Sequence, residues 1–244
     1  MADNKQKRGG KPLEGEDFGD IAESLMERHG DRMEENAELA RQLEDERAAA
    51  EVIKRIATLR ARGVPREHAE PIATGTLFGT RSLGAARRWL TTRETILVLA
   101  GAPGCGKTQA AAWCVAQPPF RDYDGIHGPG GHWPGDLMPR FLDVSRLARM
   151  SRYDESLMTP LERCALLIID DMGQEYVDAK GFFHSLIDGL INARHADQLK
   201  TIITTNLSRP DFELRYGPRV ADRLRDGTFI SSAEQTLRGG GATR

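Results

Sequence analysis

The 244-residue sequence lacks several features that define particular protein classes. It has three cysteines, Cys105, Cys114 and Cys164, without CxxC or Cys/His spacing, which argues against a disulfide framework and a zinc site. Its apolar runs, such as 96–100 and 165–169, are too short to span a membrane, and no apolar leader follows the polar N-terminus. A net charge of −2 gives no global attraction to nucleic acid. We therefore expect a soluble cytoplasmic protein with reduced thiols and only local contacts to nucleic acid.

The N-terminal quarter differs in composition from the rest of the chain. Residues 1–13 are basic with little to bury, which predicts a disordered tail. Residues 14–62 are rich in Glu, Arg, Ala, Leu and Met, which favours helix. Apolar residues recur there every three or four positions, and His29-Gly30-Asp31 is expected to separate two helices. Two interpretations stay open: a charged helical hairpin lying on its own core, or a docking arm for another protein.

Residues 63–231 alternate between β-rich and helical patterns, and residues 232–244 form a short tail. We expect strands at 95–100, 141–144, 165–169 and 200–205, and helices at 82–90, 107–116, 145–157 and 181–195, the last with Phe182, Leu186, Leu190 and Ile191 on one side. Residues from Gly63 to Gly84 are expected to be connecting structure. The alternation predicts an α/β fold, a parallel sheet covered by helices on both faces. The Gly- and Pro-rich segment 117–139 is a long loop, either functional or mobile.

A phosphate-binding motif follows the first core strand. It consists of Gly101, Ala102, Pro103, Gly104, Cys105, Gly106, Lys107 and Thr108. The match to G-x-x-x-x-G-K-[ST], between a strand and a helix, predicts a P-loop whose backbone N–H groups surround the phosphates of ATP. Lys107 is expected to bind the β- and γ-phosphates, and the Thr108 hydroxyl is expected to bind Mg²⁺.

Polar residues end two later strands. Asp170 and Asp171 follow an apolar strand, where a parallel sheet presents side chains to a ligand. Asp170 is the expected partner of Mg²⁺, and Asp171 the residue that polarises the attacking water, although its side chain is shorter than the Glu often found there. Asn206 ends another strand and is expected to hold that water or the γ-phosphate. Arg219 and Arg223 lie four apart on a predicted helix, so they either pair with nearby aspartates or act as arginine fingers on a neighbouring subunit's ATP.

Taken together, GAPGCGKT, LLIIDDMG, TIITTNLS and RYGPRVADRLRDG resemble the AAA+ ATPases of the bacterial helicase-loader group (DnaC/DnaI type) and the related IstB-type transposition ATPases. The resemblance covers about residues 63–230. It implies that Asp170 and Asp171 are Walker B, that Asn206 is sensor 1, and that Arg223, with Arg219 as second choice, is the arginine finger. It also implies little or no C-terminal lid, with Arg238 as a sensor 2 candidate.

The resemblance further implies partners. Residues 17–62 would bind a hexameric replicative helicase, and Arg146, Arg149, Arg152 and Tyr153 would contact single-stranded DNA. ATP would control self-association, assembly and release, and hydrolysis would be slow and stimulated by partners. Two alternatives stay open. One is an IstB-type ATPase that regulates a transposase on DNA, and the other is a nucleotide-binding adaptor with negligible turnover.

Overall fold

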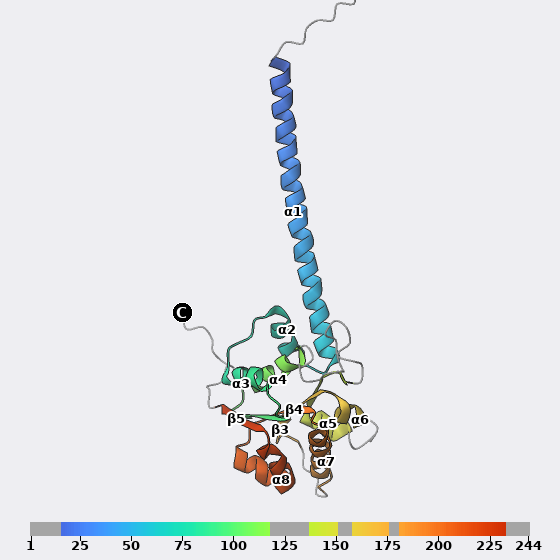
Figure 1. Cartoon of the computed structure of the whole chain (residues 1–244), viewed down its shortest axis with the longest axis vertical. Coiled ribbons are helices and arrows are strands. Elements are labelled where there is room, and N and C mark those ends of the chain that lie inside the picture. The colour runs from blue at the N-terminus through green and yellow to red at the C-terminus, as the bar shows by residue number, and fades with distance from the viewer. Residues whose placement is uncertain (1–15, 118–136, 151–157, 176–180, 233–244) are drawn as a thin grey trace, which may run out of the picture. The chain divides into compact units, whose positions relative to one another are not determined.

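The structure is a computed structural model that describes residues 16–117, 137–150, 158–175 and 181–232 (Figure 1). The chain divides into two compact units, residues 1–51 and 52–244. Within the described residues, no helix combines the length and the apolar character needed to cross a membrane.

The described part of the first unit is a single helical segment, residues 16–51, called the arm below. It belongs to helix α1, Glu16–Ala61, which runs without interruption through Gly30. The predicted break at His29-Gly30-Asp31, and with it the helical hairpin, is therefore wrong. One exposed glycine inside a helix costs only about 1 kcal/mol relative to alanine, which many favourable neighbours offset.

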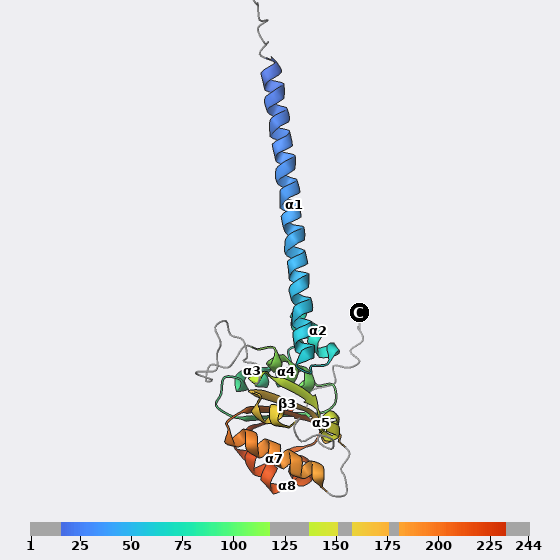
Figure 2. The same cartoon turned by 90° about the vertical axis from the view of Figure 1, so that its right-hand side faces the viewer.

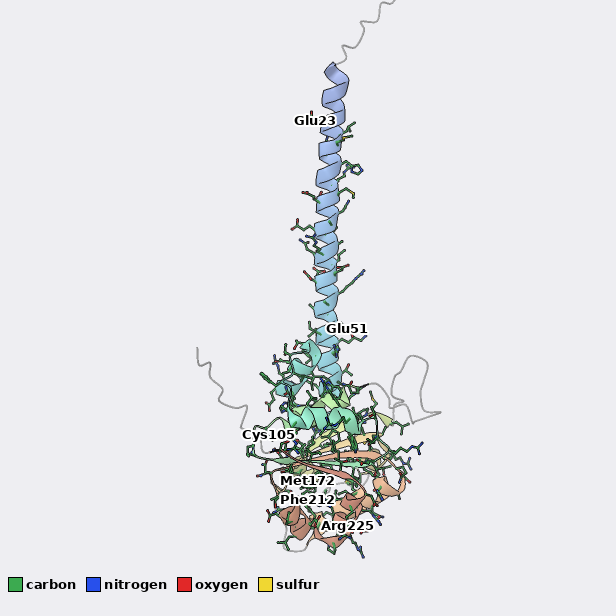
Figure 3. The ribbon with its side chains drawn as sticks, turned by 60° about the vertical axis from the view of Figure 1, so that its left-hand side comes forward. Glu23, Glu51, Cys105, Met172, Phe212 and Arg225 are labelled. Carbon is green, nitrogen blue, oxygen red and sulfur yellow. The ribbon has the colours of Figure 1, made fainter. Side chains whose placement is uncertain are left out.

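Every arm side chain that the structure describes is exposed. Figure 3 shows these side chains pointing outward around the helix between the labelled Glu23 and Glu51. They include five large apolar side chains, Leu25, Met26, Met33, Leu39 and Leu43. The last turns of α1 belong to the second unit, where Leu59 is buried and Ile56 packs against the core.

The second unit is built on a five-stranded parallel sheet of order β2-β3-β4-β1-β5. Its strands are β1 Ile96–Gly101, β2 Arg140–Asp143, β3 Leu166–Met172, β4 Lys200–Thr205 and β5 Thr228–Ser232. The four predicted strands are present, and β5 was missed. Central strands β1, β3 and β4 are buried almost throughout, which explains their continuous runs of Ile, Leu and Val.

Helices cover both faces of this sheet, as predicted (Figure 2). On one face, Leu97, Leu99 and Ile168 pack with α2 Arg66–Thr74, α3 Arg81–Trp89 and α4 Lys107–Val115. On the other, Ile96, Val98 and Leu167 pack with α5 Val144–Met150, α6 Thr159–Arg163, α7 Phe182–Ala196 and α8 Arg209–Arg225. Alternate residues of one strand thus serve two separate hydrophobic clusters.

Three helices differ from the sequence-based expectation. Helix α2 lies in the stretch expected to be connecting structure, and it contains Pro71. Helix α8 begins at Arg209 rather than near Pro218, and its Gly217 is non-helical. On α7 the buried side chains include Phe183 and Ile187, whereas Phe182 is 49% exposed. The expected α7 face was therefore shifted by one residue at its N-terminal end. Residues 151–157, the end of the predicted helix after β2, lie outside the described residues.

Candidate active site

The P-loop connects β1 to α4, the strand–loop–helix context that the motif requires. Two of its glycines are required sterically. Gly101 has φ 146°, and a Cβ there would lie 2.3 Å from the Ser232 oxygen of β5. Gly106 precedes α4 with φ 84°, and a Cβ there would lie 2.7 Å from Thr80 Cγ2. The loop therefore packs tightly against its neighbours while the exposed Ala102 and Pro103 face solvent.

Lys107 is a buried cation, only 5% exposed. Its Nζ donates to Gly101 O at 2.8 Å, Ala102 O at 2.9 Å and Asn206 Oδ1 at 3.0 Å, and Cys105 Sγ lies at 3.8 Å. All four acceptors are neutral atoms. Because a buried charge is unfavourable without an opposite charge, this arrangement fits an anion such as a phosphate.

Asp170 lies at the end of β3 and is 6% exposed. Burial raises its pKa to about 7, and the neighbouring charge of Asp171 adds to this, while hydrogen bonds from the Thr204 and Thr108 hydroxyls oppose it. The Thr204 bond to Asp170 Oδ1 is 2.6 Å long. Thr108 and Asp170, the two predicted Mg²⁺ ligands, are thus in contact with each other. A divalent cation would favour the ionised carboxylate, and these oxygen ligands suit Mg²⁺.

Asp171 occupies an unusual backbone conformation, with φ 56°. Its N–H donates to Thr204 Oγ1 at 2.9 Å, and its carbonyl accepts from the Gln174 N–H at 3.1 Å. The pairing of β3 with β4 shifts register between Ile169 and Met172. Left-handed conformations of non-glycine residues are uncommon and occur often at functional sites. The turn directs Asp171 to the cavity that the P-loop lines.

A cavity of about 680 Å³ joins these motifs. From the predicted set it is lined by Pro103, Gly104, Gly106, Lys107, Thr108, Asp171 and Asn206. Asp170 does not line the cavity, but its carboxylate accepts a hydrogen bond from Thr108, which does. The pocket therefore unites the P-loop with the ends of β3 and β4, which are 60 to 100 residues away in sequence.

The same cavity is also lined by residues that sequence reasoning missed. Glu67, His68 and Pro71 of α2, together with Phe78, line it, and Phe78 is 64% exposed. These residues lie in the segment interpreted as connecting structure. An aromatic side chain next to a run of Gly and Thr is a weak signal, and it became informative only when the fold brought it to the P-loop.

A buried polar cluster adjoins the turn of Asp171 and was also missed. The Glu175 carboxylate, whose side chain is wholly enclosed, forms an ion pair of 2.9 Å with Arg215 of α8. It also accepts a hydrogen bond of 2.8 Å from the Tyr216 hydroxyl. Residues on either side of Glu175 carry no motif, so nothing in the sequence distinguished it from a surface glutamate.

Arg219 and Arg223 do not line the cavity. They border a separate hollow of about 390 Å³ with Asp188, Asn192 and Asp222, between α7 and α8. Arg219 pairs with Asp188 at 3.4 Å, and Arg223 donates to Asn192 Oδ1 at 3.1 Å. The alternative in which these arginines pair with Asp222 or Asp226 is thus seen for Arg223, whose Nη1 lies 3.6 Å from Asp222 Oδ2. A role in this chain's own phosphate site is not compatible with their position, so a finger role would require a second subunit.

The predicted DNA-contacting residues are described only in part. Arg146 and Arg149 are exposed on α5, directly after β2. Arg152, Tyr153 and Arg238 lie outside the described residues, as does most of the 117–139 segment.

The three cysteines are buried and unpaired, and burial raises the pKa of Cys114 and Cys164. Among the described residues, no group of three or more His, Cys, Asp or Glu side chains is placed to bind a metal.

No protein-family model and no curated protein matches this sequence significantly. Solved structures are similar to it, among them the crystal structure of the DnaC helicase loader, with a TM-score of 0.46 and 23% identity over 62% of this chain and 88% of that one. The crystal structure of DnaI has a TM-score of 0.47 and 16% identity over 65% of this chain and 83% of that one.

The replication initiator DnaA bound to AMPPCP and single-stranded DNA is also similar, with a TM-score of 0.46 and 12% identity. The match covers 64% of this chain and 45% of the DnaA chain. The fold of this chain, a five-stranded parallel sheet covered by helices on both faces with the P-loop after β1, is the α/β fold that the motifs predicted.

Proposed function

We propose that this chain binds ATP with Mg²⁺, hydrolyses it slowly, and uses the nucleotide to control assembly as a helicase loader. The observation that carries the ATP site is the buried Lys107 ammonium, whose hydrogen-bond acceptors are all neutral and which lines a cavity with Asp171 and Asn206. A phosphate supplies the missing negative charge. The hypothesis of hydrolysis rests on the carboxylates and amide that surround the same cavity.

The roles of the site residues follow from their positions. Backbone N–H groups at the start of α4 and the Lys107 ammonium would bind the phosphates. Thr108 and Asp170 would hold Mg²⁺, which when bound neutralises charge on the phosphates. Asp171 would orient the attacking water and accept its proton. Asn206, now bonded to Lys107, would turn its amide to the γ-phosphate or the water once Lys107 binds phosphate instead.

The cavity-lining residues of α2 and Phe78 fit the nucleoside. Phe78 presents an exposed aromatic face, and Pro71 adds apolar surface beside it. Stacking of a base on an aromatic side chain tolerates any base, whereas His68 and Glu67 offer hydrogen-bonding groups that can discriminate among them. We therefore place the adenine near Phe78 and α2.

The arm is the part of the chain suited to a protein partner. Between positions 16 and 51 it carries thirteen acidic and four basic residues, so it repels both DNA and a second copy of itself. It also leaves Leu25, Met33, Leu39 and Leu43 exposed. Exposed apolar side chains do not stabilise an isolated helix, but they can stabilise a complex with a partner that buries them. A partner with an apolar groove bordered by basic residues matches both properties. In this proposal that partner is a replicative ring helicase, which the arm would hold until hydrolysis releases it.

Single-stranded DNA would be contacted by the second unit. Exposed Arg146 and Arg149 on α5 provide positive charge for phosphates at the edge of the sheet formed by β2. We include Arg152 and Tyr153 in this contact on the basis of sequence. Weak binding that falls steeply with salt is the expected behaviour of such a small basic patch.

One observation favours a second candidate, an adaptor that binds nucleotide with negligible turnover. Asp171 has a shorter side chain than Glu, and burial raises the pKa of its neighbour Asp170 to about 7, which disfavours the charged form that Mg²⁺ needs. Hydrolysis by an Asp171→Ala protein equal to that of the parent in a single-turnover assay would support the adaptor. A large loss of hydrolysis would exclude it.

The assembly role is tested by light scattering coupled to size-exclusion chromatography, with a non-hydrolysable ATP analogue, with and without single-stranded DNA. We expect the parent protein to assemble with nucleotide and the Arg223→Ala protein to stay monomeric. Arg225→Ala is the matched control, because Arg225 is an exposed arginine on the same helix that pairs with Asp222. A parent protein that is monomeric under every condition would contradict nucleotide-controlled assembly. Only the proposal of an ATP site would then remain, and the adaptor would be favoured.

Helicase binding is tested by replacing apolar arm residues. The double substitution Leu39→Ser and Leu43→Ser should abolish capture of the replicative helicase of the same organism. Ile53→Ser is the control, since Ile53 is an exposed apolar residue of α1 outside the arm. Equal loss of capture in both proteins, or retention in both, would contradict binding through the arm.

A further inference from the structure

Glu175 is a buried carboxylate that the roles above do not use. It is 4% exposed and lies two residues after Gly173, in the turn that follows β3. A carboxylate leaves water at a large cost unless charged or hydrogen-bonding partners replace the water. The identity of those partners therefore indicates what this side chain does.

Its partners come from two separate parts of the fold. Glu175 Oε2 accepts from the Gly173 N–H at 2.8 Å, within the turn. Oε1 accepts from Arg215 Nε at 2.9 Å and from the Tyr216 hydroxyl at 2.8 Å, both on α8. Arg215 also donates to the Glu175 carbonyl at 3.0 Å. Burial and the nearby Glu175 carboxylate raise the pKa of Tyr216, so its hydroxyl remains protonated as the donor.

The turn that Glu175 contacts depends on support from its surroundings. Asp171 has φ 56°, and Gly173 has φ 104° at a position where a Cβ would lie 2.9 Å from Leu207 Cδ1. Such conformations persist only where neighbouring contacts hold them. The Thr204 hydroxyl holds the Asp171 N–H on one side, and Glu175 holds the Gly173 N–H on the other.

Helix α8 changes direction directly beyond these contacts. Gly217, with φ 85° and ψ 173°, interrupts the helix between Tyr216 and Pro218. Arg215 and Tyr216, on the first part, contact Glu175, whereas Arg219 and Arg223 lie on the second part. Glu175 is thus bonded to both the turn of the candidate active site and the segment that leads into the candidate finger arginines.

We propose that Glu175 is a positioning residue that couples the turn bearing Asp171 to helix α8. It fixes Asp171 for hydrolysis, and it transmits the nucleotide state of the cavity to the α8 segment beyond Gly217. The proposal rests on the ATPase function proposed above and adds to it a route between hydrolysis and subunit contact.

The test compares Glu175→Gln with a matched control, Glu213→Gln. Glutamine keeps the shape of glutamate but lacks the second acceptor oxygen and the charge. Glu213 forms an equivalent 2.9 Å ion pair with Arg209 on the same helix, but at the surface. We expect Glu175→Gln to lower kcat about tenfold or more while the affinity for mant-ATP changes about twofold or less, because the change misplaces Asp171 without touching the phosphate contacts. Glu213→Gln should match the parent in both.

A purely structural role predicts a different pattern. In that case Glu175→Gln would lose thermal stability, nucleotide affinity and kcat together, and this outcome would overturn the proposal, as would an unchanged kcat. Tyr216→Phe provides a milder variant if Glu175→Gln does not fold. It removes a single hydroxyl bond to Glu175, and we expect kcat to fall about threefold at unchanged nucleotide affinity.

A second measurement separates this proposal from the proposed function. Amide hydrogen exchange of residues 218–225 should slow when the parent protein binds ATPγS with Mg²⁺, and this response should be absent in Glu175→Gln. If the parent binds nucleotide without hydrolysing it, the proposed ATPase function is wrong. The exchange response would still test whether Glu175 couples the cavity to α8. An exchange response that is the same in both proteins would refute the coupling.

Discussion

The arm, residues 16–51, and the core, residues 52–232, differ in where their charged side chains lie. In the arm every described side chain is exposed, and acidic residues outnumber basic ones about threefold. Among the described residues of the core the buried charges are few: Lys107 and Asp170 at the candidate active site, Glu175 beside it, and Arg194 and Lys200 elsewhere. Surface charges are solvated and contribute little to stability. A buried charge, by contrast, needs an opposite charge or hydrogen bonds that replace the lost water.

This contrast indicates that the two regions rely on different sources of stability. The core has two hydrophobic clusters, one on each face of its sheet. The arm has only helix propensity and local contacts such as that between Arg28 and Ser24. We therefore expect substitutions at buried core charges to have large effects, and changes in the arm to leave the core unaffected. Four predictions test this, beginning with the largest expected effect.

Asp170→Asn should stabilise the nucleotide-free protein in a pH-dependent way. The folded pKa of Asp170, about 7, lies above the ordinary 3.8, so the folded state keeps a proton that the unfolded state loses. This group therefore lowers stability as pH rises from about 4 to about 7, and the loss remains above pH 7. Each unit of pKa difference corresponds to about 1.4 kcal/mol. The substitution should therefore raise the free energy of unfolding by up to about 4 kcal/mol at pH 8.

Thermal melts at pH 8 and pH 5 measure this gain, which should shrink at the lower pH. Asp188→Asn, at a less buried aspartate on α7, serves as the control. A stabilisation that is the same at both pH values would contradict the raised pKa. Hydrolysis should meanwhile be lost in Asp170→Asn, because the neutral amide cannot replace the carboxylate beside Mg²⁺.

Lys107→Ala should weaken ATP binding about a hundredfold, equivalent to about 3 kcal/mol, because it removes charge-assisted hydrogen bonds to phosphate. Isothermal titration calorimetry measures the affinity. Lys54→Ala, at an exposed lysine of α1, should bind ATP as the parent does. Similar affinities for the parent and the Lys107 variant would show that the cavity is not a phosphate site.

Phe78→Ala should weaken ATP binding about tenfold, since loss of base stacking costs about 1–3 kcal/mol. Inorganic triphosphate should bind both proteins equally, because it has no base. Phe182→Ala is the control for removing an exposed phenylalanine elsewhere in the core. If triphosphate binding fell as well, Phe78 would act on the fold of the loop rather than on the base.

Removal of residues 1–51 should have the smallest effect on the core. We expect the melting temperature to shift by about 2 °C or less and the ATP affinity to stay within about twofold, because the core clusters contain no residue before Ile56. Calorimetry of the shortened protein checks both. A large loss of stability would show that the arm is part of the core, contrary to the comparison above.

The elements that the sequence predicted correctly are those with a clear local pattern of apolar residues. Three of the four predicted strands, β1, β3 and β4, were recognisable because central parallel strands are buried on both faces and form continuous apolar runs. Strand β5 is shorter and only partly buried, and its Thr228–Ser232 segment follows Gly227 without such a run. Helix α2 was missed because Pro71 and the flanking glycines outweighed its weak apolar pattern.

The candidate site divides in the same way. The P-loop, the acidic pair and Asn206 were identifiable from sequence, since each is a short local pattern whose spacing reflects strand and loop geometry. Tertiary structure alone brought Phe78 and α2 to the cavity, placed Arg219 and Arg223 outside it, and paired Glu175 with Arg215 and Tyr216, 40 and 41 residues away. Contacts between residues so far apart in the chain depend on how the layers pack, which no local pattern encodes. The sequence by itself determined the motifs on which the proposed nucleotide-binding chemistry rests, because each is a short local pattern. The tertiary structure decided which remote side chains join those motifs, because layer packing brings them together.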